Sequence, residues 1–356
     1  MLFRSPLPIL NCGMACQFNT SEVVPLDQLD PYVQDALDLI EFANGDTNTP
    51  WGKLRAELGH PAPFGLKMMG VGNEQWGEQY IERFQVFQKA VKSKYPNISL
   101  ITSVGPFPDN EEFQYLSKTL ADLHADILDE HYYQVPGWFL NNANRYDKYD
   151  RNGPKIFAGE YAAQSKHTVS PDNKNTWRCA LSEAAFMTGL ERNADMVRMA
   201  SYAPLMAHVD GWQWKPDMIW MDNLRSFGTP NYYVQKLYAT NKGDQIVPVL
   251  YKNAPATGQD SLYATASFDK TSNEVIVKIV NASGKAQQGE ILLDGAGKLN
   301  STARLTLLQS NDLEAENSLD QPMQISPIEQ TAPVKNGKLN TTLAPYSFSV
   351  FRVKLR

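Results

Sequence analysis

The sequence predicts an α/β domain followed by a smaller all-β domain. Up to about residue 242, short apolar runs of strand length alternate with segments whose apolar residues recur every three or four positions. From residue 243 on, short stretches of alternating apolar and polar residues follow one another, separated by turn residues. We therefore expect one domain over residues 1–242 and an antiparallel β-sandwich over residues 243–356.

The first domain contains six units in which a strand precedes a helix. The expected strands are 6–14, 66–73, 98–104, 126–133, 155–161 and 196–202. The expected helices are 31–43, 78–94, 111–124, 177–191 and 231–240, with a short one inside 134–152. Strict alternation with almost continuously apolar strands predicts a parallel sheet covered by helices. Periodicity alone leaves open whether this is a doubly wound sheet or most of a (β/α)8 barrel.

Local signals define several of these elements. Asp30 is a suitable N-cap for the first helix, with Pro31 at its first position and Asn44-Gly45 at its end. Residues 45–65 are rich in Asn, Pro, Gly and His and predict a loop, and 208–222 predict a long, tryptophan-rich loop.

The second domain contains no helical pattern of useful length. Its expected strands are 262–268, 274–280, 290–293, 304–308, 338–343 and 346–353. The segment 269–273 predicts a hairpin loop between the first two of them. No long linker separates the domains, so we expect the sandwich to pack on the last helix of the first domain.

Composition excludes several classes of function. The net charge of −6 does not favour binding to nucleic acid or to an anionic membrane surface. No run of about 18 apolar residues is present, so we expect no membrane span. The three cysteines, Cys12, Cys16 and Cys179, are too few and too scattered for a disulfide framework, and we expect buried thiols. The first six residues do not resemble a signal peptide, because prolines interrupt the segment and no cleavage site follows.

Two glutamates occupy equivalent places in the predicted sheet. Glu74 follows the apolar strand 66–73, and Glu160 ends the strand 155–161. A pair of carboxylates is what glycoside hydrolysis requires, one as proton donor and one as nucleophile, and a separation of about 5 Å predicts retention of configuration. The alternative is that both glutamates are structural ion-pair partners.

Four motifs together carry a resemblance to a known family. They are Gly72-Asn73-Glu74 with Trp76-Gly77, then 130–133 (EHYY), 158–161 (AGEY), and 214–220 (WKPDMIW) with Asp222-Asn223. In this order and spacing they resemble the retaining α-L-arabinofuranosidases, over essentially the whole chain. The resemblance implies a (β/α)8 TIM barrel followed by a C-terminal β-sandwich. It places Glu74 after barrel strand 4, so that residues 1–242 would hold strands 3 to 8 and lack the first two βα units, as in an N-terminally truncated enzyme.

The resemblance also implies roles for individual residues. Glu74 would be the general acid/base, Glu160 the nucleophile, and Asn73 a hydrogen-bond partner of the sugar 2-hydroxyl. His131 and Tyr133 would line the site, with the tyrosine hydroxyl orienting the nucleophile. Candidate sugar platforms are Trp76, Trp212, Trp214 and Trp220. His131 beside acidic residues suggests a metal site, but no paired histidine spacing supports one, so we expect neither metal nor cofactor.

The predicted function is exo-acting release of terminal non-reducing α-L-arabinofuranosyl residues from arabinan or arabinoxylan. Two alternatives remain open: an inactive or merely sugar-binding remnant, and a related retaining barrel glycosidase acting on xylan or β-glucan. The expected partner is an arabinose-containing polysaccharide or oligosaccharide, not nucleic acid or a membrane, and an oligomer remains possible. The sequence does not choose between a secreted or periplasmic location and a cytoplasmic one.

Overall fold

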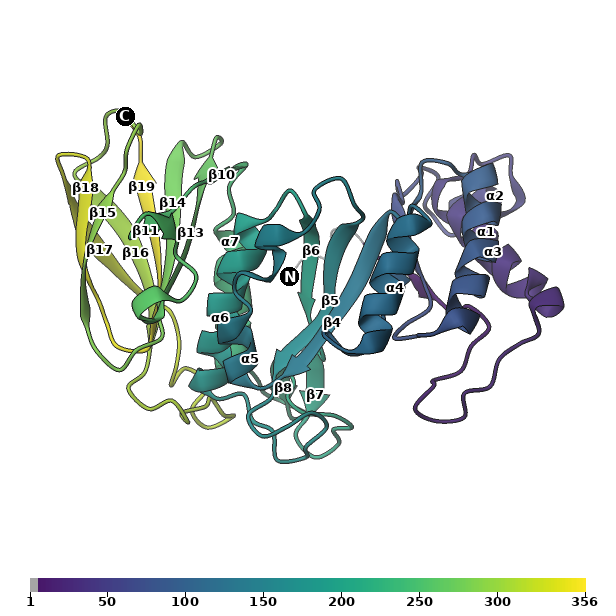
Figure 1. The fold of residues 1–356 in the computed structure, drawn as a ribbon, viewed down its shortest axis with the longest axis horizontal. Helices are drawn as coiled ribbons and strands as arrows, with labels where there is room; N and C mark the ends of the chain where they lie inside the picture. The colour runs from purple at the N-terminus through teal and green to yellow at the C-terminus, as the bar shows by residue number, and fades with distance from the viewer. Residues whose placement is uncertain (1–5) are drawn as a thin grey trace. The chain divides into compact units, whose positions relative to one another are not determined.

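The computed structural model describes residues 6–356 and contains two compact units, each described here by itself (Figure 1). The first unit comprises the chain up to Tyr132 together with Asp150–Gly159, and the second comprises Tyr133–Tyr149 and Glu160–Arg356. The boundary expected at 242/243 stays a prediction. Part of the segment considered as a signal peptide, residues 1–5, lies outside the described residues.

A six-stranded sheet confirms the predicted α/β class. Its strands are β1 (Ile9–Leu10), β2 (Met68–Val71), β3 (Ser99–Ser103), β4 (Ile127–Gln134), β5 (Lys155–Ala163) and β6 (Val197–Tyr202). They are neighbours in strict chain order, and β1 to β4 pair in parallel. A doubly wound sheet reverses its strand order at a switch point, whereas barrel strands follow one another. The order therefore decides for the barrel type, as expected for barrel strands 3 to 8.

The helices of the first unit agree with the predicted pattern except at one place. They are α1 (Asp30–Asn44), α2 (Pro50–Glu57), α3 (Glu78–Lys94) and α4 (Glu111–Asp122). Helix α1 begins at Asp30 itself with Leu29 as its N-cap, so the expected cap is shifted by one residue. Helix α2 was not predicted, since its segment lies in the expected loop 45–65.

Tertiary hydrogen bonds explain the unpredicted helix α2. Thr49 caps it, because its hydroxyl oxygen accepts a hydrogen bond from Gly52 N at 3.2 Å. The guanidinium of Arg55 is fully buried and donates to the backbone carbonyls of Phe42, His60 and Pro61 at 2.8, 3.0 and 3.1 Å. These contacts, rather than an apolar stripe, hold the helix in place.

The second unit contains three helices and an unpredicted small sheet. The helices are α5 (Pro136–Asn141), α6 (Trp177–Arg192) and α7 (Pro230–Thr240), and short 3-10 turns lie at 145–148 and 259–261. Within and beside the expected loop 208–222, three short strands form a sheet: β7 (Met206–His208), β8 (Ile219–Met221) and β9 (Ser226–Gly228). The prediction of an unstructured loop there was therefore wrong in part.

The C-terminal residues form the predicted antiparallel β-structure around one apolar core. Eight strands lie in the order β10, β13, β14, β19, β16, β17, β18, β15. Their bounds are β10 Gln245–Val247, β13 Leu262–Asp269, β14 Glu274–Asn281, β15 Gln287–Leu292, β16 Thr302–Gln309, β17 Ile328–Lys335, β18 Lys338–Leu343 and β19 Ser347–Lys354, and β11 (Leu250–Tyr251) pairs with β12 (Ala254–Pro255). Strands β10 and β17 were not predicted. Side chains from strands near both ends and from the middle of this order, such as Leu262 of β13, Phe351 of β19 and Leu343 of β18, share the same core.

The strands of this β-structure pack on helix α6 as well as on the last helix. Helix α6 lies against β13 and β14, while α7 contributes Tyr238, whose ring stacks on Phe348 with centroids 5.2 Å apart. Lys278 of β14 is fully buried and pairs with Glu191 of α6. Helix α6 is therefore a second contact of the β-structure, beside the expected last helix.

Two of the three cysteines are buried, as expected, but Cys16 is exposed. Burial raises the pKa of the Cys12 thiol to about 11 and that of Cys179 to about 12, so both are neutral at physiological pH. Among residues 6–356, no helix has the length and apolar character needed to cross a bilayer.

Candidate active site

Glu74 sits on a sharp turn directly after β2. Gly72 and Glu74 both have left-handed backbone conformations, with φ of +76° and +58°. A Cβ on Gly72 would lie only 2.6 Å from Gln75 Oε1, so this position requires glycine. For a glutamate, the left-handed conformation costs about 1–2 kcal/mol and persists only where the surroundings enforce it, which is common at functional sites.

Hydrogen bonds from β3 and α3 enforce this turn. The side chain of Gln75 accepts from Asn73 N, and the backbone oxygen of Gln75 accepts from Ser103 Oγ at 3.0 Å. The buried Tyr80 hydroxyl donates to Val71 O at 2.6 Å and accepts from Ser103 N at 2.8 Å. The ends of β2 and β3 are thus tied together just before the chain presents Glu74.

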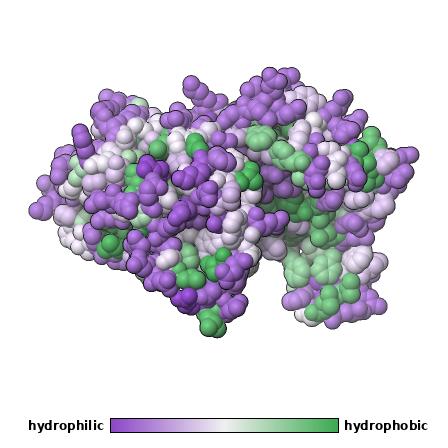
Figure 2. Space-filling view, turned by 90° about the horizontal axis from the view of Figure 1, so that it is seen from below, coloured by the Kyte–Doolittle hydropathy of each residue, from purple (hydrophilic) through white to green (hydrophobic). Residues whose placement is uncertain are grey.

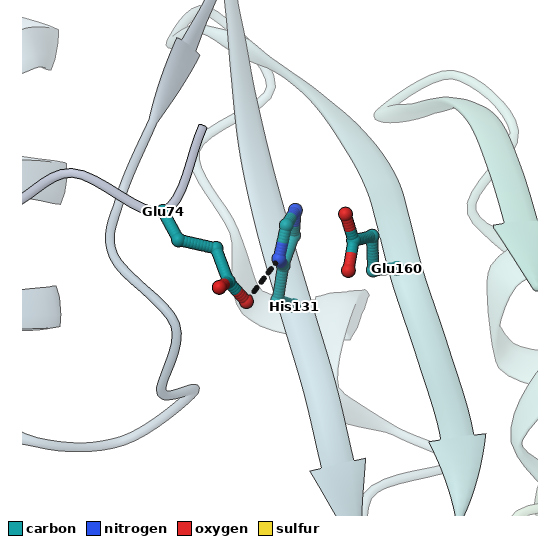
Figure 3. Close-up of side chains that lie close together, drawn as sticks. All are labelled: Glu74, His131 and Glu160. Carbon is teal, nitrogen blue, oxygen red and sulfur yellow. Dashed lines mark hydrogen bonds and ion pairs between the residues drawn. The ribbon is translucent and has the colours of Figure 1, made fainter. Parts of the chain in front are cut away.

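His131 of β4 holds the carboxylate of Glu74. Its Nδ1 lies 2.9 Å from Glu74 Oε1 (Figure 3). Its Nε2 lies 3.3 Å from Asp129 Oδ2. The imidazole is buried, with 2% of its side chain exposed, while 27% of the Glu74 side chain is open to solvent. The protonation of the imidazole decides which atom donates in each of these two contacts.

Glu160 lies within β5, three residues before its end, and has a different partner. The hydroxyl of Tyr133 donates to Glu160 Oε2 at 2.6 Å. The Tyr133 ring packs edge-on against Trp214, with centroids 5.3 Å apart, and Thr168 Oγ1 donates to Tyr133 O at 2.7 Å. These contacts fix the direction from which the phenol reaches the carboxylate.

Strand β4 supplies the partners of both glutamates. Side chains alternate along a strand, so Asp129, His131 and Tyr133 share one face, and neighbours on that face are about 6.8 Å apart. Glu130 and Tyr132 share the opposite face, where the Tyr132 hydroxyl donates to Glu130 Oε2. The acidic residue that lies on the same face of β4 as His131 and faces its Nε2 is therefore Asp129, not the adjacent Glu130.

The same residues raise the question of a metal ion. Ligand atoms of Glu74, His131 and Glu160 lie within 4.8 Å of one another. Both ring nitrogens of His131 already face carboxylate oxygens, so a cation there would have to displace one of them. This arrangement favours a hydrogen-bonded acid–base cluster over a metal site.

The four candidate tryptophans differ in their surroundings. Trp76 and Trp214 are half-buried, and the indole N–H of Trp214 has no hydrogen-bond partner among the described residues. Lys215 lies over the ring of Trp212, with Nζ 4.1 Å from its centroid. Trp220 is buried and donates to Asn175 Oδ1 at 3.3 Å, which fits a packing role better than a sugar platform. Asn73 is exposed beside Glu74.

Sequence reasoning missed Asp129 as the second partner of His131 and Glu183 as a buried acid behind β5. Period-two alternation in 127–134 would have found Asp129. Glu183 lies in a helix without an exposed polar face, since every residue from Cys179 to Leu190 is buried. A single glutamate within such an apolar helical segment is the sequence pattern that could have indicated a buried acid. Its Oε1 accepts from Ala163 N at 2.8 Å, and burial raises the pKa of its carboxyl to about 8.

Strand-borne carboxylates that each have a separate hydrogen-bond partner define an acid–base site of the kind that glycoside hydrolases use. Comparison with known families agrees. Residues 159–347 match the model of the α-L-arabinofuranosidase C-terminal domain, and residues 4–151 match that of the α-L-arabinofuranosidase 1 domain. The chain belongs to the α-L-arabinofuranosidase family, glycoside hydrolase family 51.

Individual relatives support this assignment. The chain is 49% identical over 244 residues to an extracellular exo-α-L-arabinofuranosidase of Streptomyces chartreusis, covering 68% of this chain and 28% of that protein. It is 32% identical over 353 residues to α-L-arabinofuranosidase 1 of Arabidopsis thaliana, covering 98% of this chain and 49% of the relative. The structure of arabinose-bound MgGH51 α-L-arabinofuranosidase superimposes with a TM-score of 0.86 at 33% identity, over 98% of this chain and 55% of that one. The chain thus spans about half the length of most relatives it matches.

Proposed function

We propose that this chain carries the catalytic residues of a retaining glycosidase that releases terminal non-reducing α-L-arabinofuranosyl residues from arabinan or arabinoxylan. The observation that carries the proposal is the pair of glutamates, Glu74 after β2 and Glu160 on β5, each with its own partner on β4. Family membership supports it, as does the name of the Streptomyces relative, an extracellular exo-α-L-arabinofuranosidase.

Glu160 is the nucleophile in this proposal. Its carboxylate attacks the anomeric carbon, the bond from that carbon to the glycosidic oxygen breaks, and Glu74 donates a proton to the departing oxygen. Glu74 then removes a proton from water, the water oxygen attacks the anomeric carbon, and the ester to Glu160 breaks. Two displacements give overall retention, and the Tyr133 hydroxyl holds the nucleophile through its hydrogen bond to Oε2.

The proton that Glu74 donates has a source in the surrounding groups. In the proposed mechanism, one proton lies between His131 Nδ1 and Glu74 Oε1, which are 2.9 Å apart. A short transfer along this 2.9 Å contact converts a carboxylate beside an imidazolium into a carboxylic acid beside a neutral imidazole. Asp129 faces the other ring nitrogen, Nε2, and the proton that Glu74 removes from water in the second displacement restores the starting state.

Asn73 and the two half-buried tryptophans complete the proposed site. Asn73 is exposed next to Glu74 and would bind the sugar 2-hydroxyl. Trp214 presents an indole N–H without a protein partner beside Tyr133, and it would bind a sugar hydroxyl there.

The test is hydrolysis of p-nitrophenyl α-L-arabinofuranoside by the wild type and by the Glu160→Ala and Glu74→Ala variants. We expect the Glu160 variant to be inactive and the Glu74 variant to regain turnover with azide, giving a glycosyl azide. NMR of the first-formed anomer of the product checks retention. Equal rates in all three proteins would overturn the proposal, and cleavage of only xyloside or β-glucoside substrates would assign the site to the related glycosidases. Binding of arabinose without any cleavage would indicate a sugar-binding remnant.

A further inference from the structure

Three aromatic rings gather beside the Glu74 turn in the first unit. The Phe18 ring lies 5.0 Å from the ring of Trp76 and 5.9 Å from that of Phe107, between centroids. Phe18 is 61% exposed and Phe107 is 41% exposed, so the rings leave much of their surface open to solvent. They come from the loops that follow β1, β2 and β3, at the carboxyl ends of these strands.

Figure 1 shows the arrowheads of β4 and β5 pointing downward, so the view from below in Figure 2 looks onto the carboxyl-terminal edge of the sheet. On this face, hydrophobic side chains reach the surface in patches among hydrophilic ones.

We propose that Phe18, Trp76 and Phe107 bind the leaving-group sugar, the ring whose glycosidic oxygen Glu74 protonates. This inference rests on the proposed function and extends it to the part of the substrate that is not arabinose.

The loop does not need Phe18 to hold its position. The side chain of Gln17 forms two hydrogen bonds with the backbone of Trp76, accepting from its N at 2.8 Å and donating to its O at 3.0 Å. A β-bridge between Met14 and Val23 closes the base of the same loop. The exposed ring of Phe18 is thus held over Trp76 by its neighbours in the chain, and its own burial contributes little.

Position and chemistry both identify the ligand. Trp76 is two residues from Glu74, so their Cα atoms are at most about 7.2 Å apart, close enough for a ring attached to the protonated oxygen to meet the indole. None of the three side chains is charged, which suits a neutral ligand. Flat aromatic faces cover the apolar C–H face of a sugar, and nearby Asn73 is an exposed amide for its hydroxyls. The structure therefore assigns a pyranose or furanose of the polysaccharide chain to these rings.

The experiment compares two substrates that differ in the leaving group. Methyl α-L-arabinofuranoside has no leaving-group ring, whereas an arabinofuranosylated xylo-oligosaccharide has one. For the double variant Phe18→Ala/Phe107→Ala, we expect KM for the oligosaccharide to rise about tenfold, equivalent to about 1.4 kcal/mol, while kcat/KM for the methyl glycoside stays within about twofold of the wild type. Phe64→Ala is the matched control, because Phe64 is 53% exposed but precedes β2 at its amino end.

Equal losses on both substrates, or an unchanged KM for the oligosaccharide, would overturn the inference. If the wild type cleaves neither substrate, the proposed function fails. Binding of a xylo-oligosaccharide to the three rings can then still be tested separately. Saturation-transfer NMR with the unsubstituted xylo-oligosaccharide would then have to show contacts in the wild type and the Phe64→Ala protein that the double variant loses. Equal signals in all three proteins, or no signal in the wild type, would show that the rings do not bind this sugar.

Discussion

The buried acid Glu183 gives a prediction whose magnitude follows from the structure. It lies in the middle of α6 and is fully buried; Oε1 accepts from Ala163 N, and Oε2 has no hydrogen-bond partner among the described residues. Burial is the main cause that raises the pKa of this carboxyl from 4.5 to about 8. The Ala163 N–H, which donates to Oε1, favours the ionised form but offsets only part of this effect.

The sign of the pH dependence follows from proton counting. Between about pH 4.5 and pH 8, the folded protein keeps a proton on Glu183 that the unfolded chain has lost. The free energy of unfolding therefore falls as the pH rises through this window, by about 1.4 kcal/mol per pH unit and on the order of 5 kcal/mol in all. The same stability is fully present below pH 4.5, where both states are protonated.

Substituting Glu183→Gln removes this titration while keeping an oxygen that accepts from Ala163 N. We expect the variant to gain about 3–5 kcal/mol relative to the wild type at pH 8, and to differ little at pH 4.5. Urea unfolding at several pH values measures this, with Glu82→Gln, on the exposed face of α3, as the matched control. Parallel stability curves for the wild type and the Glu183 variant would refute the reasoning, because they would mean that Glu183 ionises equally in both states.

Three further predictions concern other buried or hydrogen-bonded groups. Tyr133→Phe removes the 2.6 Å hydrogen bond to Glu160 but keeps the ring contact with Trp214, so we expect kcat on an aryl arabinofuranoside to fall about 10- to 100-fold with little change in thermal unfolding. Lys278→Met leaves Glu191 buried without its partner and should cost about 3–5 kcal/mol in urea unfolding, which a second substitution, Glu191→Leu, should largely restore. Arg55→Met deprives three backbone carbonyls of their donor and should lower the free energy of unfolding by about 3 kcal/mol, and a loss below about 1 kcal/mol would contradict the role given to Arg55.

Most predicted strands and helices were confirmed because periodic segments carry their own signal, whereas the strand expected over 6–14 is only Ile9–Leu10 in the structure. The helix Glu78–Lys94 was predicted with its observed bounds, since its apolar stripe is regular and a proline follows it. Helix α2 could not be predicted in this way, because it has no regular apolar stripe and Arg55 stabilises it through backbone carbonyls outside the helix, in helix α1 and in the segment that follows α2. Strands β7 to β9 have three residues each and exist only through pairing with one another, which no local pattern reveals.

The candidate site shows the same limit. Resemblance to the family identified Glu74, Glu160, His131 and Tyr133 and predicted the contact of the Tyr133 hydroxyl with Glu160, but it did not predict that His131 contacts Glu74. The pairing of His131 with Glu74 depends on the left-handed backbone conformation of Glu74, which the sequence Asn-Glu-Gln does not predict. Roles for these residues remain predictions for the kinetic tests above.

Strand β4 explains how two carboxylates can be set for opposite tasks. In the proposed mechanism, Glu74 exchanges its proton with the imidazole of His131, whereas Glu160 accepts a hydrogen bond from the phenol of Tyr133. The two partners, His131 and Tyr133, are one side-chain repeat apart on the same face of the strand, about 6.8 Å along it. The register of β4 therefore sets both the chemical character and the spacing of the pair. It follows that exchanging the two partners, His131→Tyr with Tyr133→His, should abolish turnover of the aryl arabinofuranoside even though every group type is still present.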